Sequence, residues 1–269
     1  MKAALLPLAS LVVFSATACQ TADPRHGIDR SETQLKERNY QWTAAPEIDL
    51  VSGPAVAIRA YIESWVDAQT MGSLDYTYPG FETAVQKPSG QSDSSPLTVG
   101  LIPDADRAPL IDPVFGNNRF RISHIVTNGE SRTAFLCNFR YGLAHRQDNG
   151  AFRSVASQFR DDDGIDPMLV ILAKRSDTAD NLPDQAGPEP APANDVFGDW
   201  KITGFVNGFG LSGSSVAEWP TFHQDNQTCI DQAPDDPARR AFLTSGDHPR
   251  SDFPTSPPVP GWPKSGERA

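Results

Sequence analysis

The chain has 269 residues, of which 38% are hydrophobic and 21% are charged, values that are typical of a globular protein and exclude wholesale disorder. Its 34 acidic residues outnumber its 23 basic residues, so the net charge is −11; this balance argues against nucleic acid as a partner, because nucleic-acid sites are basic. The length allows one or two domains, and the 24 prolines and 20 glycines predict long irregular segments.

Residues 1–18 have the pattern of a signal peptide. Lys2 is followed by an uncharged, largely apolar stretch that ends at Ala18. This stretch is shorter than the roughly 20 apolar residues that a membrane-spanning helix needs. We therefore expect the chain to be exported and the leader to be removed. Ordinary cleavage after Ala18 would fit the A-x-A pattern that residues 16–18 form.

The segment Ser15-Ala16-Thr17-Ala18-Cys19 also resembles a bacterial lipobox, in which small residues precede a cysteine that receives a diacylglyceryl group. It departs from the usual motif at Ala16, where leucine is typical. The resemblance implies a lipoprotein whose Cys19 carries lipid, including fatty acids such as palmitate. Two or three acyl chains give stable anchoring, so the protein would be held on the extracytoplasmic face of the cell membrane. Ordinary cleavage without lipid stays open as the alternative.

Two other cysteines remain if Cys19 carries lipid, namely Cys137 and Cys229. In an oxidising compartment a pair of cysteines predicts one disulfide. The alternative is two unpaired buried thiols. Neither residue lies in a CxxC motif or close to a histidine cluster, so we expect no metal site there.

The mature chain begins with a polar stretch, residues 19–50, which has no sustained hydrophobic period and is predicted to be a tether. Tyr40 and Trp42 are the first residues expected to pack. Ser52 and the following Gly-Pro are typical of a helix start, and Gly72 is typical of a helix end. The apolar spacing between them predicts an amphipathic helix.

The charged residues of this helix, Arg59, Glu63 and Asp67, follow one another at intervals of four. This spacing is typical of a solvated helix face that is supported by pairs of opposite charge. The three residues are therefore placed on the polar face of the helix.

Alternating apolar residues on either side of Asn128-Gly129 predict a β-hairpin with a type I′ turn. Counting across that turn places Ile122 opposite Phe135 and Phe120 opposite Cys137. It also predicts that His124 points inward. The single buried face would then carry Phe120, Ile122, Phe135, Cys137 and Phe139.

Further along the chain, the apolar run 168–172 predicts a central strand, and residues 197–205 predict a second strand. Residues 208–269 have nine prolines between Pro220 and Pro263 and little periodicity. We expect them to form an irregular, Pro-rich C-terminal extension whose last residues are free.

Three segments carry a family resemblance: AIRAYIESWVDAQ (57–69), DYTYPGFETAV (75–85) and VFGDWKITGF (196–205). The order of elements resembles an NTF2-like (SnoaL-like) domain, and the segments resemble uncharacterised actinobacterial exported proteins. The resemblance implies an α+β domain over residues 51–207, with an N-terminal helix packed on a curved antiparallel sheet that forms a cone. Long insertions at 86–118 and 176–195 depart from that pattern and leave a plain antiparallel α+β domain as the alternative.

The NTF2-like resemblance also suggests candidate site residues. In catalytic members an Asp/His pair can line the cone, so His124 with Asp67 or Asp75 would be the catalytic pair. Its alternative is a hydrogen-bonded core or edge histidine. Tyr61, Trp65 and Phe135 could line a cavity for an apolar molecule, or could be plain core.

Residues 161–166 contain four aspartates and a glycine, as calcium loops do, but they lack the distal glutamate of an EF-hand and are interpreted as a solvated turn. No cofactor-binding motif is present, so we expect no cofactor and no metal. The sequence therefore predicts a non-enzymatic envelope lipoprotein that binds an apolar small molecule or another envelope protein. The alternative is a small NTF2-like isomerase or dehydratase.

Overall fold

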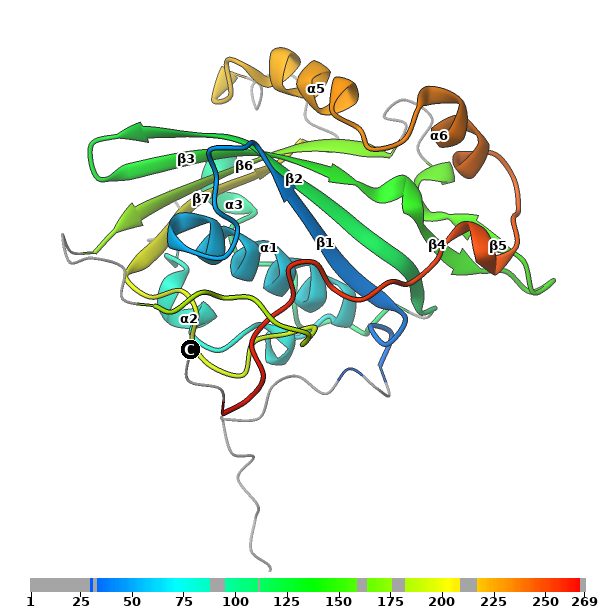
Figure 1. Ribbon diagram of the computed structural model, residues 1–269, viewed down its shortest axis with the longest axis horizontal. Helices are drawn as coiled ribbons and strands as arrows, with labels where there is room; N and C mark the ends of the chain where they lie inside the picture. Colours follow the sequence, from blue (N-terminus) through cyan, green and yellow to red (C-terminus); the bar gives the residue numbers. More distant parts are fainter. Residues whose placement is uncertain are drawn as a thin grey trace, which may run out of the picture.

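The computed structural model of the chain describes residues 30, 33–87, 95–110, 112–158, 164–175, 182–208 and 217–266 (Figure 1). These residues form an α+β fold around one open sheet of seven strands. Three sequence features lie outside the described residues: the leader, Cys19 and Asp161–Asp163.

The sheet has the strand order β5-β4-β2-β3-β6-β7, and β1 lies off this path and pairs with β2. The β1–β2 pair is parallel and the other pairs are antiparallel. The strands are β1 (Arg38–Ala44), β2 (Val114–Asn128), β3 (Ser131–Phe139), β4 (Leu143–Arg146), β5 (Phe152–Ser154), β6 (Ile165–Lys174) and β7 (Trp200–Asn207). The apolar run 168–172 lies in β6, which pairs on both edges, as a central strand does.

Helices cover both faces of the sheet (Figure 1). The long helix α1 lies across one face, and α5 and α6 lie across the other. The α-helices are α1 (Gly53–Met71), α2 (Phe81–Ala84), α3 (Pro96–Val99), α5 (Phe222–Asp231) and α6 (Pro237–Thr244); the 3-10 turns are η1 (Leu74–Tyr76), η2 (Arg140–Gly142), η3 (Val155–Gln158) and η4 (Arg250–Asp252). The start of α1 after Ser52 and its end at Gly72, where φ is +64°, are those that the sequence predicts.

The main core fills the space between α1 and the sheet, and β1 belongs to it. Tyr40 and Trp42 are buried there; the Trp42 ring stacks on Phe120 of β2, and the Tyr40 ring lies tilted beside it. The predicted tether is therefore wrong for residues 33–50. Its polar composition is misleading because Arg38, the first residue of β1, is itself buried and is paired with a carboxylate of α1.

The C-terminal segment forms a second core on the opposite face of the sheet. Cys229, Leu243 and Phe253 pack there against Cys137 and Phe139 of β3. The predicted irregular extension is thus wrong. Prolines did not prevent helices from forming: Pro237 occupies the first turn of α6, where its missing N–H costs nothing, and Asp236 accepts the N–H of Arg239 as the cap.

The end of the chain then returns to the α1 side of the sheet. Val259 exchanges backbone hydrogen bonds with Tyr40 and Trp42 of β1, so the red C-terminal segment runs beside the blue strand in Figure 1. Trp262 is only 1% exposed and belongs to the main core. The expectation of free last residues is therefore wrong as far as residue 262.

The β2–β3 hairpin exists, but its register differs from the predicted one. Asn128 pairs with Ser131, so the two turn residues are Gly129 and Glu130. Gly129 has φ +60° and takes the first turn position, as glycine does in a type II′ turn. A bulge between Ile122 and His124 adds a second shift, and Ile122 consequently pairs with Leu136.

This register divides the predicted buried face between the two cores. Phe120 and Ile122 face α1, whereas Cys137 and Phe139 face the C-terminal helices, and Phe135 packs beside Trp219 on that same side. A single buried face is wrong because both faces of the sheet are covered. Hydrophobic residues therefore occupy consecutive positions of β3 instead of alternating with polar ones.

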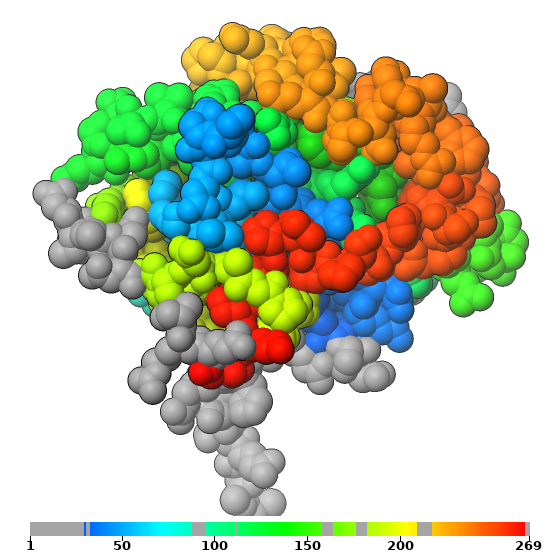
Figure 2. Space-filling view, viewed as in Figure 1, coloured from blue at the N-terminus to red at the C-terminus, as the bar shows by residue number. Residues whose placement is uncertain are grey.

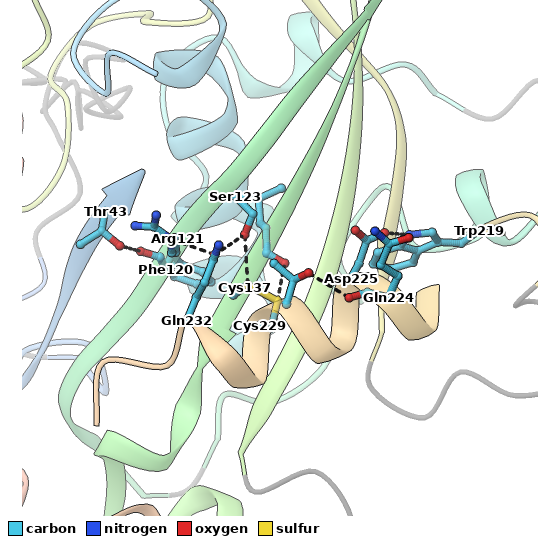
Figure 3. Close-up of a disulfide and its surroundings, with 12 residues drawn as sticks. Thr43, Phe120, Arg121, Ser123, Cys137, Trp219, Gln224, Asp225, Cys229 and Gln232 are labelled. Atoms are coloured by element: carbon cyan, nitrogen blue, oxygen red, sulfur yellow. Dashed lines mark hydrogen bonds between the residues drawn. A yellow bond between two sulfur atoms is a disulfide. The ribbon is translucent and has the colours of Figure 1, made fainter. Parts of the chain in front are cut away.

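The predicted disulfide joins Cys137 of β3 to Cys229 of α5, with an S–S distance of 2.02 Å (Figure 3). Both cysteines are buried, and the Ser123 hydroxyl lies 3.4 Å from the Cys137 sulfur. The bond therefore attaches the C-terminal segment directly to the sheet.

We expect reduction of this bond to lower the free energy of unfolding by about 4 kcal/mol. A cross-link between residues 92 apart lowers the entropy of the unfolded chain, and reduction restores that entropy. Urea unfolding with and without dithiothreitol measures the difference. The Cys137→Ser/Cys229→Ser double variant is the control and should not respond to the reductant. Free thiols at both positions in the untreated protein would contradict the pairing.

Candidate functional site

The three charged side chains of α1 form a buried polar row. Arg59, Glu63 and Asp67 are 0%, 1% and 0% exposed, so the prediction that they form a solvated face is wrong. The reason lies in segments far away in sequence. This side of α1 is covered by Arg30, by residues 33–42 and by the Pro-rich segments around Gln185 and Trp262.

Asp67 is surrounded by donors from the N-terminal segment. It accepts hydrogen bonds of 2.5 Å from the Arg38 guanidinium and 2.5 Å from the Tyr40 hydroxyl, and a nitrogen of Arg30 lies 3.3 Å from its other oxygen. The two arginines neutralise the buried carboxylate. Asp67 therefore holds the N-terminal segment on α1.

Glu63 is the second acceptor of the row. It accepts hydrogen bonds from the indole of Trp42 at 2.7 Å, the hydroxyl of Tyr78 at 2.7 Å and the indole of Trp262 at 2.8 Å. Burial raises the pKa of Glu63, although the positive charge of Arg59 and the three donors act in the opposite direction. The carboxyl thus connects β1, the turn before α2 and the end of the chain.

Arg59 completes the row by donating to backbone instead of to a carboxylate. Its guanidinium lies 4.3 Å from the ring centroid of Trp262, and burial lowers its pKa. It makes hydrogen bonds of 2.8 to 3.2 Å to four carbonyl oxygens. These belong to Leu50, Gln185, Pro260 and Gly261.

The predicted catalytic pair is not brought together. The bulge at Ser123 turns His124 to the outer face of the sheet, where its ring stacks on Phe135 at 4.3 Å. Asp67 lies in the polar row on the α1 side, and Asp75 is exposed at η1. The inward position predicted for His124 is therefore wrong, because counting by twos fails across a bulge.

His124 lines a cavity of about 320 Å³ beside the start of α1, together with Glu47 and Asp49. The Ser52 hydroxyl donates to Asp49 at 2.7 Å and lowers the pKa of that carboxyl. The cavity therefore holds an imidazole and two carboxylates, but Asp49 is already engaged in the turn that precedes α1.

The predicted ligand-binding aromatic residues do not line one cavity. Tyr61 is fully buried and donates to the carbonyl of Leu101, and Trp65 packs beside it against Phe205. Phe135 lies on the other face of the sheet. Tyr61 and Trp65 are core residues of the α1 side.

A polar pocket that the sequence did not reveal lies where β1, β2 and the C-terminal segment meet. We call it the junction pocket; its volume is about 170 Å³. Arg119 pairs with Asp235 at 2.6 Å, and Arg239 pairs with Asp252 at 2.8 Å. Its polar lining consists of Gln41, Asn117, Arg119, Asp235, Arg239 and Asp252.

Within the described ranges, no three His, Cys, Asp or Glu side chains are grouped so as to hold a metal ion. None of the helices there has the length and apolar character that crossing a membrane requires.

Nothing matches this chain among protein-family models, curated proteins or solved structures.

We expect Asp67→Asn to lower the free energy of unfolding by about 3–5 kcal/mol, because Arg30 and Arg38 would stay buried without a carboxylate. Asp75→Asn is the matched control; its exposed side chain predicts a change within about 0.5 kcal/mol. Chemical denaturation of both variants tests the row. Equal effects would contradict the role of Asp67.

Burial raises the pKa of four of the five tyrosines, Tyr40, Tyr61, Tyr78 and Tyr141. The ordinary pKa of a tyrosine is about 10. We therefore expect no more than one tyrosine of the folded chain to ionise near that pH. Stability should fall above that pH, because the unfolded chain then releases protons that the folded chain keeps.

The number of tyrosines that ionise near pH 10 is measured by ultraviolet titration of tyrosinate absorbance. The urea-unfolded chain is the reference, in which all five ionise together. Ionisation of two or more tyrosines in the folded chain near pH 10 would contradict it.

Proposed function

We propose that the protein is an exported, lipid-anchored binding module of the cell envelope that acts without catalysing a reaction. Cys19 would carry the lipid and hold the folded part on the extracytoplasmic face of the cell membrane. The ligand or partner protein would bind at the surface of the fold instead of between α1 and the sheet.

The observation that carries this proposal is the Cys137–Cys229 disulfide. Both cysteines lie in a well-packed core, and the bond fixes the C-terminal segment on the sheet. Disulfides of this structural kind persist in oxidising compartments and are rare in the cytosol. The bond therefore agrees with export by the signal sequence.

The distance between the lipid and the fold also supports anchoring close to the membrane. Arg30 is already buried against Asp67. The chain from Cys19 to Arg30 spans at most about 40 Å when fully extended. The folded part would therefore stay near the bilayer surface.

A non-catalytic role is supported by the state of the interior acids. Asp67 and Glu63 each face three donors and hold separate segments of the chain together. A carboxyl in that state is a structural group, because moving it would leave buried donors unsatisfied. The isomerase or dehydratase alternative would have to use the cavity of His124 and Glu47 instead.

An NTF2-like relationship is part of the proposal. A long helix across one face of an open, mainly antiparallel sheet supports it. The parallel strand β1 and the C-terminal helices on the second face are additions to that plan. Buried side chains of the main core occupy the space between α1 and the sheet, where a cone would have its cavity.

The test is metabolic labelling with a clickable fatty acid in cells that express the protein or its Cys19→Ser variant. We expect label on the first and none on the second, because only the Cys19 thiol can receive the diacylglyceryl group. Membrane fractionation should follow the label. An unlabelled wild-type chain would overturn the anchor, whereas equal labelling of both would place the lipid elsewhere.

A further inference from the structure

The junction pocket is built from segments that are far apart in sequence. Gln41 comes from β1, Arg119 from β2, and Asp235, Arg239 and Asp252 from the C-terminal segment. Figure 2 shows the place as a hollow in which green atoms of the sheet are visible between blue β1 and the orange-to-red C-terminal segment. The pocket therefore depends on the tertiary fold and not on one loop.

Two ion pairs supply its charges. Arg119 and Asp235 are 23% and 29% exposed, and Arg239 and Asp252 are 39% and 19% exposed. Pairs this exposed contribute little to stability, about 0–1 kcal/mol each. The two ion pairs therefore place charged groups beside the pocket that could bind a ligand, although the stability of the fold does not require them.

The guanidinium groups keep donors for a ligand. Arg119 and Arg239 each use one nitrogen in the ion pair, and their other nitrogens make no hydrogen bond within the part of the chain that the structure describes. The guanidinium of Arg119 also lies 4.8 Å from the ring centroid of Tyr141, within the range of a cation–π contact. The planar fork of a guanidinium suits two-point recognition of a carboxylate.

The carboxylates of Asp235 and Asp252 supply acceptors for a ligand. Burial alone would raise the pKa of Asp235, but the charge and hydrogen bond of Arg119 outweigh it and hold that pKa below its ordinary value. One oxygen of Asp252 pairs with Arg239, and its other oxygen is 4.0 Å from the ring of His248. The pocket thus presents two cations and two anions.

We propose that the junction pocket binds a small zwitterion of the α-amino acid class. The ligand carboxylate would accept hydrogen bonds from Arg119 and Arg239, and its ammonium group would donate to Asp235 and Asp252. A lone anion or a lone cation would meet as much repulsion as attraction, because the four charges sum to zero. At about 170 Å³ the pocket is smaller than the sites of drug-sized ligands, so the ligand has few atoms.

The test uses the full chain with Cys19→Ser, which removes the lipid, and follows backbone amide shifts by NMR. The probes are glycine, acetate and methylamine, because the last two carry the two charges of glycine separately. We expect glycine to shift the amides of Arg119 and Arg239. Acetate and methylamine should each bind at least about tenfold more weakly.

Arg119→Gln and Arg239→Gln should each weaken glycine binding by about tenfold or more. The matched control is Arg153→Gln, which breaks an ion pair of similar length, 2.7 Å to Asp247, outside the pocket. Unfolding curves show that each variant is folded. If Arg119→Gln unfolds the chain, glycine binding by the Arg239→Gln variant tests the proposal, because Arg239 is the more exposed of the two arginines.

Absence of glycine binding would overturn the proposal, as would equal binding of acetate or methylamine, or an equal loss in the Arg153→Gln control. The inference rests on the proposed binding function but not on the lipid anchor. A labelled protein that does not bind glycine would refute only the pocket, and an unlabelled protein that binds glycine would refute only the anchor.

Discussion

The buried polar row of α1 is the constraint on which the rest of the structure depends. Taking charged groups out of water is costly, and the cost is offset only when each group meets its partners in good geometry. Asp67 needs the arginines of the N-terminal segment, and Glu63 needs Trp262 from the end of the chain. Both ends must therefore be in place before α1 is stable. Such a row favours one arrangement of the chain over others that apolar contacts alone would also allow.

The same row explains why the ends of the described chain meet. Arg30 donates toward the carbonyl of Pro190, and Trp262 exchanges backbone hydrogen bonds with Glu189. The Pro-rich segment around Glu189 and Pro190 therefore lies between the two ends and contacts both. Its prolines suit this role, because their fixed φ lowers the entropy lost when an irregular segment is ordered.

What could be predicted from the sequence was local structure and the pairing of the two cysteines that remain besides Cys19. The ends of α1 are set by Ser52 and Gly72, and the cysteine count indicated the disulfide. The failures all involve distant partners or a register change. The interval of four between the charged residues of α1 predicts that Arg59 lies on a solvated face. The carbonyl groups that it binds belong to Gln185 and Pro260, which are far away in sequence, so the local pattern could not reveal them. The side of the sheet on which His124 lies was predicted wrongly, because a bulge adds one residue to β2 just before it. The junction pocket needs contacts across more than a hundred residues.

The bulge and the disulfide act together on the outer face of the sheet. Because the register shifts at Ser123, Arg121 pairs with Cys137 and both point toward α5, where Arg121 and Ser123 hydrogen-bond to Gln232 (Figure 3). The disulfide and these bonds set the position of the chain just before Asp235. From that position Asp235 accepts a hydrogen bond from Arg119 at 2.6 Å. The geometry of the junction pocket is therefore a consequence of how the C-terminal segment is attached, and cleavage of the disulfide should loosen the pocket before it unfolds the main core around α1.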